Sequence, residues 1–377
     1  MKNYFYAALA ALLTAGCASH EGYTLTGEVP EAWEGKPVVL FTTDAGQACA
    51  VDSTKVSNGK FRLSGTFGTP RGCRVAIYLD PENRQDRNFV VSFPVFLDST
   101  AVSAVCDASH QEPVWKISGG ATQAQSDAYQ AELGALSEDY GKAFKEYAKA
   151  FYYGDDLQKS IDLARAVTEK SRARTEFTAR YIAEHPGSVV SLVALQELCD
   201  RYTSLSGERL NALFAGLSPQ LRESGAGRYT GQCVRGKRIL PGSPIPDIEL
   251  QDPGMKTRRL SEYIRPGHVT LIELWASWCN PCRADIPFVK KAYDMYHKKG
   301  FEIVSVSVDR SADRWKEAVE EEKMPWTQLL DHTGRCFQTF ETTAVPTAIL
   351  VDGEGRISLL NARGGWLFGA LQEAYDK

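Results

Sequence analysis

Short segments of alternating or continuous apolar residues fill the chain between residues 23 and 117. Examples are YTLTGEV, KPVVLFTT, GKFRLSGTF, RVAIYLD and FVVSFPVFLD, and turn-forming sequences separate them. Asn58-Gly59, between VDSTKVS and KFRLSG, predicts a tight hairpin. Short strands at this spacing predict a small β-sandwich or barrel.

The pattern changes at Ser118-Gly119-Gly120. From Ala121 to about Leu217 the chain is rich in Ala, Glu, Lys, Gln and Leu with a helical period, as in LQKSIDLARAVTEKSRARTEFTARYIAEH. Pro186-Gly187 predicts a helix end, and SVVSLVALQELCDRY predicts another helix. No heptad or fixed repeat runs through this block. We therefore expect it to pack on a neighbouring domain or on a second copy of itself as a homodimer.

Residues 239–252, ILPGSPIPDIELQD, are dense in proline and predict a semi-rigid linker. Beyond them strand and helix patterns alternate. HVTLIELWASW and FEIVSVSVD predict buried strands, RWKEAVEEEK a helix, TAILVD and RISLLN a hairpin, and GALQEAYDK a final helix. Alternation of this kind predicts a central sheet covered on both faces.

The total length of 377 residues favours two or three domains. Hydrophobic residues make up 43% and charged residues 24%, as in folded soluble proteins. The formal net charge of −4 provides no electrostatic reason to expect binding to nucleic acid. The expected fold class is therefore multidomain: an all-β domain, a helical middle segment and an α/β domain.

The N-terminus predicts export. Lys2 precedes the apolar run Tyr4–Leu13, which is too short to span a bilayer, and small residues then lead to Cys17. LTAGC resembles a bacterial lipobox, in which the cysteine is lipidated, although Thr14 stands where leucine is usual. Cleavage by an ordinary signal peptidase is the alternative. The predicted divisions are residues 1–17 (signal peptide), 18–117 (β domain), 118–235 (helical segment) and 236–377 (α/β domain).

Nine cysteines in an exported chain favour oxidising chemistry. Cys17 and the pair Cys279 and Cys282 account for three of them. The other six are scattered singly, and spacing alone decides neither bridges nor free thiols. They are Cys49, Cys73, Cys106, Cys199, Cys233 and Cys336.

The stretch WASWCNPCRADIP places Cys279 at a helix start directly after a strand, with Pro281 in the first helical turn. Unsatisfied N–H groups and the helix dipole favour an anion at this position, which lowers the pKa of a thiol. Cys282 lies one turn later on the same side and can attack a mixed disulfide. The spacing therefore predicts a dithiol–disulfide couple.

This cysteine pair has two alternative interpretations, a zinc site and an inert pair of thiols. A zinc site needs a second ligand pair, but the chain has no other CxxC, and His268 and His297 are isolated. We therefore expect no metal and no cofactor. An inert pair of buried thiols is disfavoured because a helix start after a sheet strand is normally accessible.

WASWCNPCRADIP resembles the active-site motif of thioredoxin-fold proteins, most closely the exported, membrane-tethered TlpA/ResA branch. The likeness runs from about Ile239 to Lys377 and includes PGSPIPDIEL, SVSVD and Val345-Pro346-Thr347. The preceding β domain and helical spacer resemble two-part Bacteroidetes lipoproteins whose N-terminal domain has no assigned function. The resemblance implies that Pro346 is cis and lies opposite the redox pair.

The same resemblance assigns roles to neighbouring residues. Glu273 interrupts an apolar strand, and thioredoxins carry a buried acid there that relays a proton to or from the second cysteine. A solvated Glu273 facing outward is the alternative. Asp285 matches an acidic position of the TlpA/ResA branch, which mostly carries Glu. The expected substrate-groove residues are Trp278, Asn280, Pro281, Val345 and Pro346, whereas Trp275 is expected in the core.

The predicted function is reduction of protein disulfides by an exported thiol-disulfide oxidoreductase, with a membrane-bound electron donor as the resemblance implies. A peroxiredoxin-type thiol peroxidase is the first alternative, but LIELWASWC lacks the Pro-x-x-x-Thr/Ser-x-x-Cys pattern. A partner-binding lipoprotein that uses the thioredoxin fold as a scaffold is the second.

Overall fold

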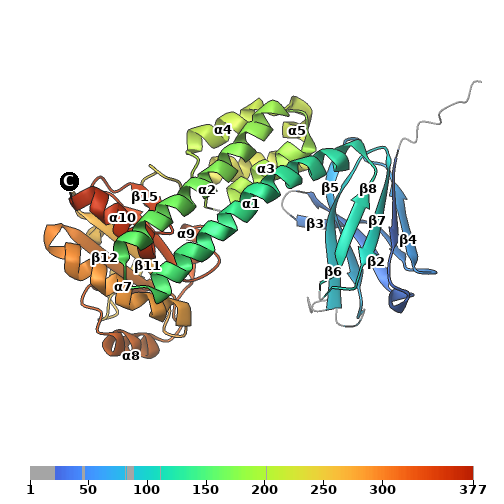
Figure 1. Ribbon diagram of the computed structural model, residues 1–377. Helices are drawn as coiled ribbons and strands as arrows, with labels where there is room; N and C mark the ends of the chain where they lie inside the picture. The colour runs from blue at the N-terminus through green and yellow to red at the C-terminus, as the bar shows by residue number, and fades with distance from the viewer. Residues whose placement is uncertain are drawn as a thin grey trace, which may run out of the picture. The chain divides into compact units, whose positions relative to one another are not determined.

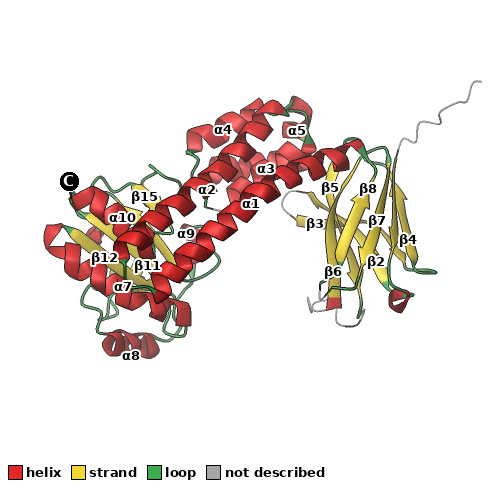
Figure 2. Ribbon diagram, in the orientation of Figure 1, coloured by secondary structure: helices red, strands yellow, loops and turns green. Residues whose placement is uncertain are grey.

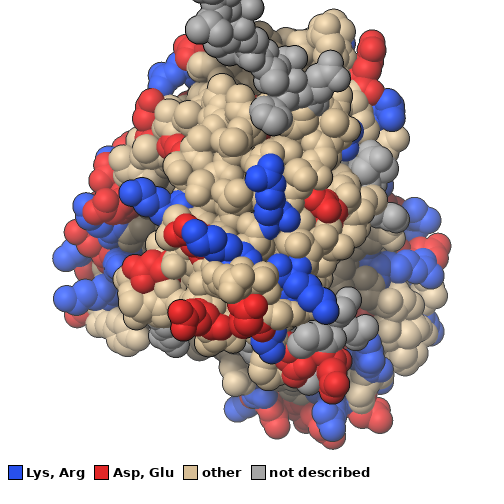
Figure 3. All heavy atoms as spheres, turned by 90° about the vertical axis from the view of Figure 1, so that its right-hand side faces the viewer, with Lys and Arg blue, Asp and Glu red and all other residues tan. Residues whose placement is uncertain are grey.

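The computed structural model describes residues 22–44, 47–80, 82, 89–110, 112–200 and 202–376. The chain divides near residue 125 into two compact units, each with its own hydrophobic core (Figure 1). The predicted signal peptide and lipidation site Cys17 lie outside the described residues. On the face drawn in Figure 3, acidic and basic side chains are interspersed among uncharged ones.

The first unit is a sandwich of two four-stranded sheets, drawn in yellow in Figure 2. One sheet has the order β4-β1-β7-β8 and the other β3-β2-β5-β6. Its core is formed by inward side chains that alternate along the strands, such as Leu25, Val38, Leu63 and Val75. The strands are β1 (Tyr23–Glu28), β2 (Pro37–Asp44), β3 (Gln47–Lys55), β4 (Lys60–Gly65), β5 (Arg71–Tyr78), β6 (Val90–Leu97), β7 (Ala101–Asp107) and β8 (Val114–Ser118).

The turn at Asn58-Gly59 forms as predicted, but the extended hairpin does not. Both residues have positive φ, and Ser57 and Lys60 form an antiparallel bridge around them. Beyond this bridge β4 pairs with β1, whereas β3 lies beside β2 in the other sheet. The hairpin prediction was wrong there because the turn connects the two layers of the sandwich. β4 places Phe61 and Leu63 in the core, whereas the described side chains of β3 at residues 48–55 are exposed or half-buried.

Six helices follow and belong mainly to the second unit. Asp156 caps α2, its carboxylate accepting from Lys159 N at 2.9 Å, and Ile161, Ala164 and Val167 then repeat along the buried side. The predicted end of this helix before Pro186 is confirmed. The helices are α1 (Ala121–Tyr153), α2 (Leu157–Glu184), α3 (Val189–Asp200), α4 (Gly207–Gly216), α5 (Pro219–Glu223) and α6 (Gly225–Gly236).

The C-terminal part is built on a seven-stranded sheet with the order β10-β9-β13-β12-β11-β14-β15. The three central strands β11, β12 and β13 are parallel, and β14 runs antiparallel to β11. The strands are β9 (Glu249–Gln251), β10 (Thr257–Arg259), β11 (Val269–Trp275), β12 (Phe301–Ser307), β13 (Thr327–Leu330), β14 (Thr347–Val351) and β15 (Ile357–Leu360). The helices are α7 (Asn280–Tyr296), α8 (Ala312–Glu322), α9 (Arg335–Thr339) and α10 (Gly364–Tyr375).

The helical segment packs on this α/β domain within the second unit. α2 lies along α10, and Ile161 of α2 joins the core of the α/β domain. Tyr147 and Phe151 of α1 form a smaller cluster with Phe288 and Trp366. As one of the two expectations had it, the helical segment packs on a neighbouring domain, here the α/β domain of the same chain.

The prediction of a linker at residues 239–252 was wrong. Ile239, Ile248 and Leu250 are buried in the main core, and Glu249–Gln251 is strand β9 of the sheet. Proline content indicated a stiff segment, but the apolar residues between the prolines bury enough surface to dock it.

The expected fold class is confirmed: an all-β domain, a helical middle and an α/β domain with a thioredoxin-like sheet. Within the described ranges, none of the helices has the length and apolar character needed to cross a bilayer. Of the cysteines whose pairing was left open, Cys73, Cys199 and Cys336 are buried thiols outside any disulfide.

Candidate functional site

The two cysteines lie where β11 gives way to α7. Cys279 is the N-cap of α7, and Pro281 occupies its first turn, where a missing N–H breaks no helical hydrogen bond. A disulfide of 2.04 Å joins Cys279 to Cys282. The Cys279 sulfur also accepts from the Cys282 backbone N–H at 3.2 Å, so one of the N–H groups left free at the helix start is directed at this sulfur.

The pair is less accessible than its position after a strand suggested. Cys279 is 4% exposed and Cys282 is completely buried. By contrast, Trp278 is 63% exposed, and Asn280 and Pro281 are exposed beside it. The flanking residues therefore form the surface around the disulfide, while Trp275 is buried in the core as expected.

A buried aspartate anchors the loop that carries Trp278. Asp309, just beyond β12, accepts from the Ser277 backbone N–H at 2.8 Å and from its hydroxyl at 2.7 Å. Ser307 donates to the same carboxylate at 2.7 Å. Sequence analysis did not single out Asp309, although it closes the SVSVD motif.

Val345 and Pro346 directly precede β14, and their peptide bond is cis. In the antiparallel pairing of β11 and β14, Leu274 lies opposite Thr347. This register brings Pro346 to the end of β11, from which the loop to Cys279 departs. Both residues are partly exposed.

Glu273 points into the molecule, which excludes the alternative of an outward-facing side chain. It is 4% exposed on β11 and lies opposite Ser305 of β12. Trp326 Nε1 donates to Ser305 Oγ at 2.8 Å, and Ser305 donates to Glu273 Oε2 at 3.0 Å. Burial raises the pKa of Glu273 to about 7 despite this hydrogen bond. A carboxyl group with that pKa can take up and return a proton near neutral pH.

Asp285 is also buried, one turn after Cys282 on α7. Arg363, immediately before α10, contacts Asp285 Oδ2 through both Nε and Nη2 at 2.5 Å. Burial raises the pKa of Asp285, and the Arg363 guanidinium acts in the opposite direction. Nothing in the sequence pointed to Arg363, because it lies 78 residues away along the chain.

Glu273, Asp285 and Arg363 line one narrow cavity beneath α7 and α10. Its walls are otherwise mostly apolar, for example Leu271, Phe288 and Leu367. Proximity of the Asp285 charge adds to the rise in the pKa of Glu273, and Arg363 opposes it. The cavity therefore contains two carboxyl groups and one fixed positive charge. In the part of the chain that the structure describes, no three His, Cys, Asp or Glu side chains gather as metal ligands would.

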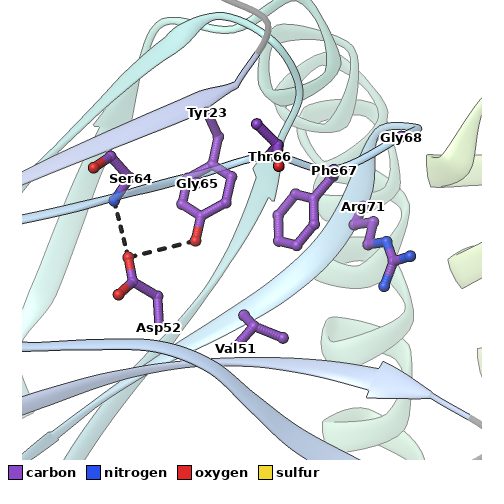
Figure 4. Close-up of a pocket in the computed structure, with 9 residues that line it drawn as sticks. All are labelled: Tyr23, Val51, Asp52, Ser64, Gly65, Thr66, Phe67, Gly68 and Arg71. Atoms are coloured by element: carbon purple, nitrogen blue, oxygen red, sulfur yellow. Dashed lines mark hydrogen bonds between the residues drawn. The ribbon is translucent and has the colours of Figure 1, made fainter.

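A second hollow lies in the β sandwich (Figure 4). Tyr23 stacks on Phe67 with ring centroids 4.6 Å apart, and Asp52 accepts from the Tyr23 hydroxyl at 3.4 Å and from Ser64 N at 2.9 Å. The Arg71 guanidinium lies 5.2 Å from the centroid of the Phe67 ring. Because Asp52 is used in bonds that tie β3 to β1 and β4, this hollow shows structural cross-linking rather than a set of reactive groups.

Comparison with known proteins agrees with this geometry. Residues 241–359 match the AhpC/TSA family, and residues 23–125 match a domain of unknown function, DUF4369. The thiol-disulfide oxidoreductase ResA of Bacillus thuringiensis is 24% identical over 129 residues, which cover 34% of this chain and 73% of the relative. ResA of Bacillus subtilis is 26% identical, with coverage of 34% and 71%.

Two solved structures are also similar. The thioredoxin domain of a thiol-disulfide oxidoreductase from Bacteroides vulgatus is 32% identical and covers 35% of this chain and 96% of its own, with a TM-score of 0.33. A thiol:disulfide interchange protein from a Bacteroides species is 30% identical, covering 37% and 93%, with a TM-score of 0.35. Residues 241–359 therefore form a thioredoxin-fold domain of the AhpC/TSA family, and the relatives of this domain in sequence are thiol-disulfide oxidoreductases of the ResA type.

Proposed function

We propose that Cys279 and Cys282 are the redox pair and that the protein reduces disulfides of other proteins. The Cys279 thiolate attacks one sulfur of a substrate disulfide, forming a mixed disulfide and releasing the first substrate thiolate. Cys282 then loses its proton and attacks the Cys279 sulfur. This step forms the Cys279–Cys282 disulfide and releases the second substrate thiolate, so that two electrons pass to the substrate.

The observation that carries this proposal is the Cys279–Cys282 disulfide at the N-terminus of α7, the helix on which the buried Asp285 follows Cys282 by one turn. The helix terminus favours Cys279 as the thiolate. Glu273 is assigned as the base for the Cys282 proton, and Asp285 assists it electrostatically. Trp278, Asn280, Pro281, Val345 and Pro346 are assigned to the groove that receives an extended substrate segment.

Replacement of the resolving cysteine tests this mechanism. Cys282→Ala should accumulate mixed disulfides through Cys279, because the intermediate loses its intramolecular attacker. The measurement is non-reducing electrophoresis of cell extracts after acid trapping of thiols. A Cys279→Ser/Cys282→Ser variant is the control and should form no such adducts. Absence of dithiothreitol-sensitive adducts in the Cys282→Ala extract would show that the mechanism is wrong.

The direction of electron flow is part of the proposal. Potentials of this fold range from about −270 to −120 mV, and a reductant lies near the lower value. Equilibration of the intact chain with glutathione or dithiothreitol buffers measures its potential. A value near −120 mV would instead indicate an oxidant.

We also propose that the chain is exported, that Cys17 anchors it to a membrane and that a membrane-bound dithiol donor reduces it again. Mass spectrometry of the mature N-terminus, with Cys17→Ser as the control, tests the anchor. The boundaries 1–17, 18–117, 118–235 and 236–377 belong to the same proposal, and the ends of β8 at Ser118 and α6 at Gly236 support two of them.

A homodimer through the helical segment is proposed from exposed aromatic side chains of α1. Phe144, Tyr152 and Tyr153 are 42%, 48% and 88% exposed. Sedimentation over a range of concentrations measures the oligomeric state. A monomer at all concentrations would rule the dimer out.

A further inference from the structure

The helical segment contacts the α/β domain at the cavity that holds the two carboxyl groups. The Tyr147 hydroxyl accepts from the Gly365 backbone N–H at 3.1 Å, and the Tyr147 and Trp366 rings lie 4.3 Å apart. The Phe151 ring lies 4.3 Å from that of Phe288, a residue of the cavity wall, with the two ring planes tilted by 39°. The C-terminal end of α1 therefore lies over the outer side of this cavity.

The same contacts enclose the backbone next to Arg363. Gly364 has φ of +53°, and a Cβ there would lie 2.3 Å from the Tyr147 hydroxyl and 3.0 Å from the Phe151 ring. A side chain at this position would clash with α1, and the backbone conformation favours glycine. Side chains of α1 therefore restrict the backbone between Arg363 and the start of α10.

Arg363 in turn contacts the buried carboxylate of Asp285. The Arg363 side chain is 28% exposed and that of Asp285 is 10% exposed. Nε and Nη2 of Arg363 both contact Oδ2 of Asp285. The titratable groups around this pair are Glu273 on β11 and Tyr147 and Tyr152 on α1. Burial raises the pKa of Tyr147 to about 12 and also raises that of Tyr152, so both phenols stay protonated near neutral pH.

We propose that Arg363 is a positioning residue for proton removal from Cys282: it holds Asp285 beside Glu273, and α1 holds Arg363 in place. This inference rests on the proposed function. Its physical basis is that a fixed positive charge stabilises the ionised form of both carboxyl groups. The ionised form is the one that can accept a proton from the Cys282 thiol. The helical segment thereby becomes part of the machinery of the redox site.

The test uses the reduced full chain and dithiobis(nitrobenzoate), a small disulfide. Attack by Cys279 releases the first nitrothiobenzoate and leaves a mixed disulfide. Attack by Cys282 releases the second, so the rate of the second phase reports resolution directly. The Cys279→Ser/Cys282→Ser variant measures the background from the remaining thiols. The rate of the second phase is followed from pH 5 to pH 10.

Arg363→Gln should move the midpoint of this pH profile upward. A rise of about one pH unit would reduce the rate at pH 7 about fivefold, with recovery at high pH, because less of the base is ionised. Arg363→Lys, which keeps the charge, should restore most of the profile. Arg165→Gln is the matched control: Arg165 on α2 pairs with Glu373 of α10 at 3.4 Å, away from the cavity.

Tyr147→Phe should move the midpoint in the same direction by a smaller amount, because Gly365 loses its acceptor and the Arg363 backbone is held less firmly. An Arg363→Gln profile identical to that of the wild type would overturn the proposal. A wild-type profile in Tyr147→Phe would overturn the role of α1. Failure of the wild type to release a second nitrothiobenzoate would instead count against the proposed function itself.

Discussion

Glu273 shows how burial can prepare one side chain for proton transfer. It stands in an apolar strand and receives a hydrogen bond from Ser305, whose own oxygen accepts from Trp326. Ser305 thus accepts from Trp326 and donates to Glu273 Oε2. Burial raises the pKa of Glu273 by more than this hydrogen bond lowers it, so the pKa rises to about 7.

A consequence for stability follows from this pKa. The folded chain holds the Glu273 proton more tightly than the unfolded chain, whose ordinary pKa is 4.5. The free energy of unfolding should therefore fall as pH rises from about 4.5 to about 7, by on the order of 3 kcal/mol, and then level off. Glu273→Gln should lose this dependence and gain stability relative to the wild type as pH rises.

Urea unfolding of both proteins at pH 5 and pH 8 measures the effect. Glu317→Gln on the exposed side of α8 is the control and should follow the wild type. If the difference between Glu273→Gln and the wild type is the same at both pH values, the folded pKa of Glu273 is not raised.

At the scale of elements, the close approach of α2 and α10 depends on small residues. Gly365 and Gly369 of α10 face α2, and a Cβ at Gly369 would lie 3.2 Å from Ile161. Trp366 donates from Nε1 to Thr168 Oγ1 at 2.9 Å across the same interface. The absence of a side chain at Gly365 and Gly369 lets the two helices pack directly, which a hydrophobic pattern alone does not reveal.

Gly365→Ala should therefore destabilise the second unit by about 1–3 kcal/mol. Its Cβ would lie 2.6 Å from the Ser160 carbonyl oxygen and 3.0 Å from the Tyr147 ring, and the backbone oxygen cannot move aside cheaply. Gly134→Ala on α1 is the matched control, because a Cβ there meets nothing within 4 Å. That change should stabilise by about 0.5–1 kcal/mol. Thermal unfolding measures the stability of the two variants. Equal stability of Gly365→Ala and Gly134→Ala would contradict the packing argument.

At the scale of the whole molecule, the cores of the two units do not share residues. The sandwich core runs from Tyr23 to Ala104, and the main core of the second unit runs from Ile161 to Leu371. The helical segment and the α/β domain, in contrast, share a core through Ile161. The helical segment and the α/β domain are therefore expected to unfold together.

Calorimetry of the full chain should show two transitions, one for each unit. Reduction of the Cys279–Cys282 disulfide and the Gly365→Ala change should alter only the transition of the second unit, because both lie in it. A single transition that shifts as a whole would show that the units unfold cooperatively.

Much of the fold and the centre of the site could be predicted from local sequence, because local physics determines them. Alternation and helical periodicity predicted the sandwich strands, α2, α3 and the α/β order. The strand–CxxC–helix pattern predicted Cys279 as the N-cap of a helix and Cys282 one turn later. Each of these features depends on residues within a few positions of one another.

Tertiary structure alone decided which distant residues meet. It buried the proline-rich segment at Ile239 and Leu250, sent β3 and β4 to different sheets, and buried Cys279 itself. It also paired Asp285 with Arg363 and placed Tyr147 against the backbone that directly follows Arg363. These contacts join residues that are far apart along the chain, and the burial that selects them is a property of the packed molecule rather than of any local pattern.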